Sequence, residues 1–100
     1  RQALGGMRLR RIPDAERSKL GLDDKMALLA EHVGQYNDHA VATRAGVLKG
    51  DILVGYDGLD GDLSEGEVIA HALTKRRAGD EVTLRMRRGD KELDFKIKLQ

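Results

Sequence analysis

The sequence predicts an α+β fold, a partly open β-barrel or sandwich of about five to six strands capped by two helices. Two patterns in the C-terminal half carry this prediction. Apolar and charged residues alternate over 82–87 and again over 93–99, which is the period of two that half-buried strands show. Before them, residues 65–77 space their apolar side chains by one, three and four, as on one face of a helix. A chain of 100 residues is long enough for one domain and too short for two.

The C-terminal elements have clear boundaries. Turn residues at 88–91 separate the two alternating runs and predict an antiparallel hairpin with one apolar and one charged face. A capping-box pattern from Ser64 to Glu67 begins the helix, and Gly79 is placed to end it. Residues 51–56 are β-prone and precede an Asp-Gly turn signal, so we expect a strand there.

The N-terminal half is patterned less sharply. Residues 7–12 predict a strand that the single proline ends, because the residue before proline favours extended backbone. Residues 14–20 predict a short helix that Gly21 stops. Periodicity alone allows helix or strand for 25–33, which we interpret as a strand, and residues 40–47 predict a short helical turn.

Composition and charge exclude several classes of function. The 18 basic and 17 acidic residues leave a net charge of +1, which argues against a general nucleic-acid binder. No apolar run approaches the roughly 18 residues that a membrane-spanning helix needs, so we expect no direct membrane insertion. The absence of cysteine excludes disulfides, a thiolate nucleophile and Cys-ligated zinc. Because the first residue is Arg, we expect residues 1–100 to be one domain of a larger protein.

The sequence contains no convincing catalytic or metal-binding pattern. His32, His39 and His71 lack the spacing of a helical metal site. The acidic residues in 57–65 lack the ligand register of a calcium-binding EF-hand loop. Neither serine lies in a nucleophile elbow. We therefore expect no catalytic residue, no metal and no cofactor in this domain.

One segment resembles the signature of a known family. Residues 42–58 read Ala-Thr-Arg-Ala-Gly-Val-Leu-Lys-Gly-Asp-Ile-Leu-Val-Gly-Tyr-Asp-Gly. This resembles PDZ domains, in which a short helix leads through Ala-Gly-Leu, a basic residue and Gly-Asp into a strand that ends at an Asn-Gly or Asp-Gly turn. On physical grounds Asp51 is a small acceptor able to bind loop amides before that strand. The helix and hairpin that follow match the order of the family's last elements.

The order of the elements resembles the bacterial, circularly permuted form of this family, found on HtrA-type serine proteases. In that form the carboxylate-binding loop opens the domain. Leu4-Gly5-Gly6-Met7 has the spacing of this loop but carries Gly5 where the family usually has an apolar side chain. Ala3-Leu4-Gly5-Gly6 is a competing register, and Lys19-Leu20-Gly21-Leu22, which we rank second, is another candidate loop.

The resemblance implies capture of an extended peptide by strand addition. The loop amides would receive the ligand's terminal carboxylate, and the helix would form the other wall of the groove. Counting back from Gly79 by resemblance places Val68 and Ala72 toward the ligand and Ile69 and Leu73 toward the core. An apolar Val68 implies a preference for apolar ligand side chains. The expected peptide-binding residues are Leu4, Gly5, Gly6, Met7, Arg8, Leu9, Val68 and Ala72.

The expected partners are a peptide or protein C-terminus and the other domains of a larger, HtrA-like serine protease, with no nucleic acid. That parent would place the domain in the periplasm or cell envelope. A structural docking or dimerisation module is the alternative, because it would use the same sheet edge. A basic nucleic-acid-binding module is a weaker alternative, since the three aromatic residues leave little for base stacking.

Overall fold

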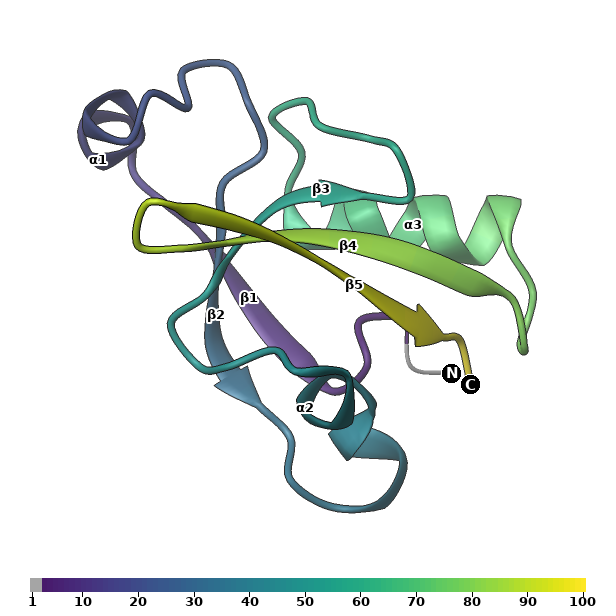
Figure 1. Ribbon diagram of the computed structural model, residues 1–100. Helices are drawn as coiled ribbons and strands as arrows, with labels where there is room; N and C mark the ends of the chain where they lie inside the picture. Colours follow the sequence, from purple (N-terminus) through teal and green to yellow (C-terminus); the bar gives the residue numbers. More distant parts are fainter. Residues whose placement is uncertain (1–2) are drawn as a thin grey trace.

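Five strands follow one another across a single antiparallel sheet in the computed structural model, which describes residues 3–100 (Figure 1). The strands are β1 (Met7–Arg11), β2 (Leu28–Val33), β3 (Ile52–Tyr56), β4 (Glu81–Arg88) and β5 (Lys91–Lys98). The helices are α1 (Asp14–Lys19), the 3₁₀ helix η1 (Asn37–Ala40), α2 (Val41–Ala45) and α3 (Glu65–Lys75). The sheet order is β1-β2-β3-β4-β5, so β1 and β5 are its edges and the sheet is not closed. The predicted α+β fold with a partly open sheet is confirmed.

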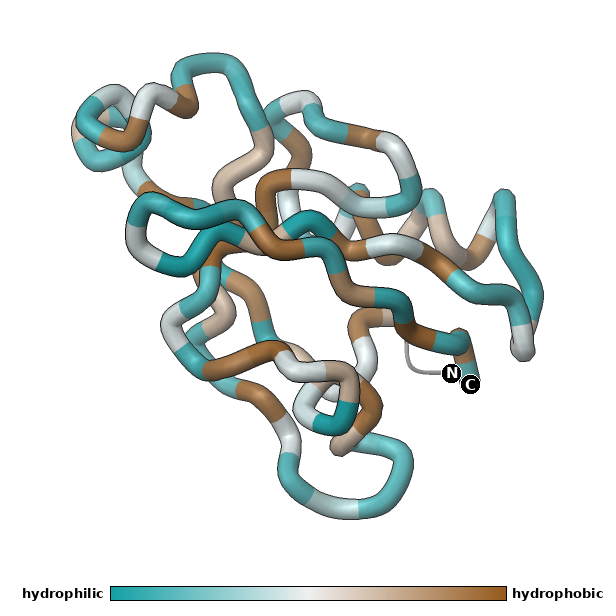
Figure 2. The backbone as a smooth tube through the Cα atoms, viewed as in Figure 1, coloured by the Kyte–Doolittle hydropathy of each residue, from teal (hydrophilic) through white to brown (hydrophobic). Residues whose placement is uncertain are grey.

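The main core lies on the face of the sheet that α3 covers. In the β4–β5 hairpin, Val82 pairs with Ile97 and Leu84 pairs with Phe95, and the apolar side chains of both strands turn toward this core. Figure 2 shows the alternation of hydrophobic and hydrophilic residues along both strands. Tyr56 is also buried, and its hydroxyl donates to the Ala3 carbonyl at 2.7 Å. That bond ties the start of the chain to the sheet.

A network of charged side chains holds the start of α3 close to the end of β1. Arg17 of α1 is 2% exposed, and its Nη1 lies 3.0 Å from Asp62 Oδ1. Asp62 also accepts from Arg11 Nη2 at 2.7 Å. Because Asp62 lies two residues before Ser64, which caps α3, this network links α1, the end of β1 and the start of α3. The Arg11 hydrogen bonds lower the pKa of Asp62, so the carboxylate stays ionised.

Several predicted element boundaries differ from the structure. The helix ends at Lys75 instead of Arg77, because Arg76 adopts an extended backbone while its side chain donates to both carboxylate oxygens of Asp57. Gly79 has a positive φ of 93° but lies in the turn into β4, four residues beyond the helix. The strand expected from residue 25 begins at Leu28. Among the described residues, no helix has the length and apolar character needed to cross a membrane.

Candidate functional site

A cleft of about 330 Å³ separates the edge strand β1 from α3. The network at Asp62 holds only one end of the helix against the strand, which leaves room for the cleft along the rest. The cleft lies at the exposed edge of the sheet, where a further strand has access to β1. Its lining residues are Ala3, Leu4, Met7, Arg8, Glu65, Ile69 and Leu73.

The turn that leads into β1 requires its two glycines. Gly5 and Gly6 have φ values of 63° and 91°, and the Met7 N–H donates back to the Leu4 carbonyl at 3.2 Å. A Cβ on Gly6 would lie 1.9 Å from the His39 carbonyl oxygen, and a Cβ on Gly5 would lie 2.9 Å from a backbone nitrogen of α2. The departure at Gly5 from the family pattern is therefore explained, because no apolar side chain fits there.

Within the part of the chain that the structure describes, two backbone N–H groups of this turn have no acceptor. The Gly5 carbonyl accepts from the Ala42 N–H at 3.0 Å, and the Gly6 carbonyl accepts from the Gly34 N–H at 3.1 Å. Within residues 3–100, neither glycine N–H donates a hydrogen bond. Successive backbone N–H groups in a turn can form a concave site for an anion. The N–H of Met7, the last residue of the candidate loop, is instead bonded within the turn.

In the second candidate loop, at residues 19–22, the backbone N–H groups already donate hydrogen bonds within the protein. Its glycine N–H donates to the Ser18 carbonyl at 3.1 Å, and the Leu22 N–H donates to the Arg17 carbonyl at 2.9 Å. These bonds close the C-terminal end of α1. The loop at Leu4–Met7, directly before the edge strand, is therefore the better candidate for an anion.

The helix presents a different face to the cleft than the sequence predicts. Val68 and Ala72 are fully buried in the main core, whereas Ile69 and Leu73 line the cleft, and Leu73 is 48% exposed. The prediction that both Ile69 and Leu73 face the core is wrong for Leu73, whereas Ile69 lines the cleft and also packs against the main core. Counting back from Gly79 assumes that the helix runs up to it, but the segment 76–79 lies outside the helix.

The sequence does not predict that Glu65 is part of the candidate site. Its Oε2 accepts a hydrogen bond from the Leu9 N–H at 2.6 Å, so it contacts the edge strand across the cleft. In the sequence it stands out only as part of the capping pattern. The signal that identifies it is its spacing, since Glu65, Ile69 and Leu73 are four residues apart and share one face of α3.

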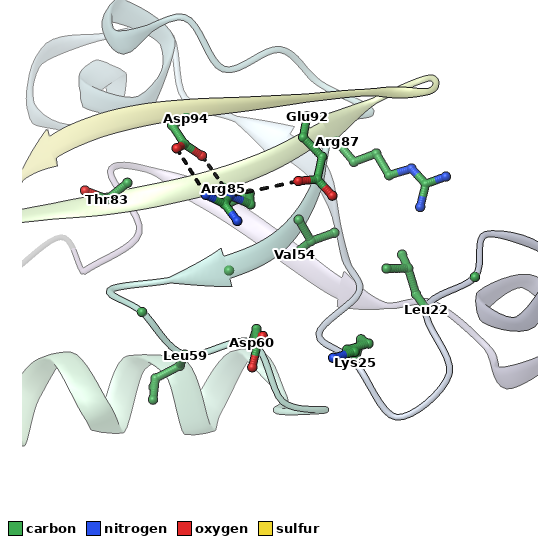
Figure 3. Close-up of a pocket in the computed structure, with 13 residues that line it drawn as sticks. Leu22, Lys25, Val54, Leu59, Asp60, Thr83, Arg85, Arg87, Glu92 and Asp94 are labelled. Atoms are coloured by element: carbon green, nitrogen blue, oxygen red, sulfur yellow. Dashed lines mark hydrogen bonds and ion pairs between the residues drawn. The ribbon is translucent and has the colours of Figure 1, made fainter.

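A second, larger pocket of about 560 Å³ is lined by residues of β3, β4 and β5 and by the loop that follows α1 (Figure 3). Four of its charged residues are paired with one another or with the backbone: Arg85 Nε lies 3.0 Å from Asp94 and 4.0 Å from Glu92, and Arg87 donates to the Leu20 carbonyl at 2.6 Å. None of the expected binding residues lines it. We therefore place the candidate site at the β1–α3 cleft.

Comparisons with known proteins agree with this architecture. No curated protein matches the chain. A variant of the HtrA-type protease AlgW with a decapeptide is similar in structure, with a TM-score of 0.72, 19% identity, and coverage of 94% of this chain and 27% of AlgW. The HtrA3 PDZ domain bound to a phage-derived ligand (FGRWV) has a TM-score of 0.69 at 24% identity, with coverage of 93% and 80%.

The chain thus spans about a quarter of the AlgW chain, and at these identities the similarity shows the fold alone. The family is shown by sequence: the family model described as PDZ domain matches residues 20–99. This match includes β2 to β5 and α3, which form four of the five strands and the helical wall of the cleft, while β1 precedes the matched residues. The chain belongs to the PDZ domain family.

Proposed function

We propose that this domain binds an extended peptide, ending in a free carboxylate, as an added strand along β1. The observation that carries the proposal is the pair of N–H groups at Gly5 and Gly6, directly before an edge strand, which have no acceptor within residues 3–100. An added antiparallel strand takes its affinity from main-chain hydrogen bonds, and a carboxylate at its end fits the anion site of the turn. Arg8, which lines the cleft, adds positive charge.

The cleft also determines which ligand side chains fit. Ile69 and Leu73 from α3 and Met7 from β1 form apolar walls. Burial of apolar ligand side chains against them contributes about 25 cal/mol per Å² of area removed from water. A preference for apolar residues near the ligand's C-terminus follows, although the residues responsible differ from Val68 and Ala72.

The domain would serve a larger protein, and an HtrA-like serine protease is the parent we propose. The similar HtrA-type AlgW structures are described with peptides, as is the HtrA3 PDZ domain. In such a parent, the domain would raise the local concentration of substrate segments or sense a peptide and bias a neighbouring domain.

A titration with short peptides tests the binding function. We expect a pool of pentapeptides with free C-termini to shift the NMR signals of Gly5 to Leu9, Ile69 and Leu73, and we expect amidated versions of the same peptides to lose the effect at Gly5 and Gly6. Shifts that survive amidation would mean that the loop does not bind the carboxylate. A pool that perturbs neither β1 nor α3 would contradict the proposal and favour the docking or dimerisation module.

The apolar wall can be tested separately with Leu73→Ala. Because Leu73 is 48% exposed, we expect unchanged thermal stability and roughly fivefold weaker binding of apolar peptides, from about 1 kcal/mol of lost contact. Leu48→Ala is a matched control, since Leu48 is 55% exposed and does not line the cleft. Calorimetric titration of both variants measures the difference, and equal affinities would exclude Leu73 from the site.

A further inference from the structure

A side chain of the protein itself reaches from the start of α3 to the edge strand β1. The hydrogen bond from the Leu9 N–H to Glu65 Oε2 is short, at 2.6 Å, and partly shielded from solvent. Leu9 is the central residue of β1, and Glu65 is the first residue of α3. A hydrogen bond to a carboxylate is about twice as strong as one between neutral groups. The contact therefore joins the two walls of the cleft.

Glu65 fills the acceptor position that an added strand needs. On its inner side β1 pairs with β2, and Leu9 is opposite Ala30. Backbone groups of an edge strand that point away from its partner are the ones that pair with a new strand. The Leu9 N–H is such a group, because its acceptor lies on α3 and not on β2. A peptide carbonyl and the Glu65 carboxylate therefore compete for the same hydrogen.

We propose that Glu65 is an autoinhibitory contact that a peptide must displace before it pairs with β1. This inference rests on the proposed function and concerns the regulation of the same site. Only molecules in which Glu65 has left the Leu9 N–H can bind the peptide. The apparent dissociation constant for the peptide therefore equals the intrinsic constant divided by the fraction of such molecules. Since a carboxylate is a stronger acceptor than a peptide carbonyl, the closed form is the favoured one.

The start of α3 does not depend on Glu65. Its capping box is formed by the neighbouring Glu67, whose Oε1 accepts from the Ser64 N–H at 2.9 Å while Ser64 Oγ accepts from the Glu67 N–H at 3.1 Å. The Glu65 side chain can therefore turn away while the helix stays in place. Substitution of Glu65 removes the contact with Leu9 and leaves this cap intact.

The first test concerns the domain without peptide. In Glu65→Ala we expect the Leu9 amide proton to shift upfield and to exchange faster with solvent, and in Glu65→Gln we expect a smaller change of the same sign, because an amide oxygen is a weaker acceptor. Glu16→Gln is the control, since Glu16 lies exposed on α1 and undergoes the same change of charge. An unchanged Leu9 signal in Glu65→Ala would overturn the inference.

The second test compares affinities for a pool of acetylated pentapeptides with uncharged side chains and free carboxylates. We expect Glu65→Ala to bind about fivefold more tightly than the unaltered domain, Glu65→Gln to be intermediate, and Glu16→Gln to be unchanged. If the unaltered domain binds and Glu65→Ala binds equally or more weakly, Glu65 is no inhibitor and the inference alone fails. If neither binds, the proposed function fails as well.

Discussion

Gly6→Ala is expected to abolish measurable peptide binding and to destabilise the domain by about 3 kcal/mol. The added Cβ would lie 1.9 Å from the His39 carbonyl oxygen and 2.7 Å from the His39 Cα, so backbone has to move. The φ of 91° adds strain, because a side chain disfavours this region. The turn would lose the geometry on which the proposed anion site depends. Thermal unfolding and the peptide titration measure the two effects.

Gly21→Ala separates steric conflict from backbone strain alone. Gly21 has a φ of 71°, and nothing lies within 4 Å of the position that a Cβ would take. We expect a loss of about 1 kcal/mol in stability and no change in peptide affinity. If Gly6→Ala were no more harmful than Gly21→Ala, the close approach of the turn to His39 would not be a requirement of the site.

The turn before β1 illustrates what the sequence can and cannot predict. The position of the Leu4–Met7 loop before a strand is predictable, because an apolar, alternating run follows it. The need for glycine at position 5 cannot be predicted in this way. It arises because α2, about 37 residues further along the chain, packs against the turn and leaves no room for a side chain. A local pattern contains no information about such a long-range approach.

The sequence mispredicts the buried face of α3 for a related reason. Apolar residues at 68, 69, 72 and 73 cover two adjacent faces, so periodicity predicts the helix but not which face is buried. That choice depends on the angle of the helix, which the Arg11–Asp62–Arg17 network at one end and the Asp57–Arg76 ion pair at the other help to hold. Both involve residues far apart in sequence.

Asp51→Ala is expected to destabilise the domain by about 3 kcal/mol, because it removes a buried carboxylate that accepts three hydrogen bonds. The Asp51 carboxylate is 3% exposed and accepts from Arg88 at 2.9 and 2.7 Å, and from the Leu48 N–H at 2.9 Å. The sequence predicts the bond to a loop amide, and the structure confirms it. The Arg88 partner lies 37 residues away and also donates to the Gly46 carbonyl, so it joins the loop to the hairpin.

The same carboxylate gives stability a dependence on pH. Burial works to raise the pKa of Asp51, but the hydrogen bonds from Arg88 and Leu48 outweigh it, and the pKa lies below its ordinary value of 3.8. A pKa that folding lowers contributes stability that is complete above the unfolded value and is lost as the pH falls below it. We therefore expect Asp51→Asn to be less stable than the unaltered domain at pH 7, and the gap between them to narrow below about pH 4.

Asp94→Asn provides the matched control for this interpretation. Asp94 also pairs with an arginine, Arg85, at 3.0 Å, but its side chain is 52% exposed. Water and salt screen such a pair, so we expect little loss of stability at pH 7. Urea unfolding of both variants from pH 3 to pH 7 measures the comparison. If Asp51→Asn and Asp94→Asn behaved alike, burial of the Asp51 carboxylate would not be what holds the loop against the hairpin, and the loss of a charge would account for both results.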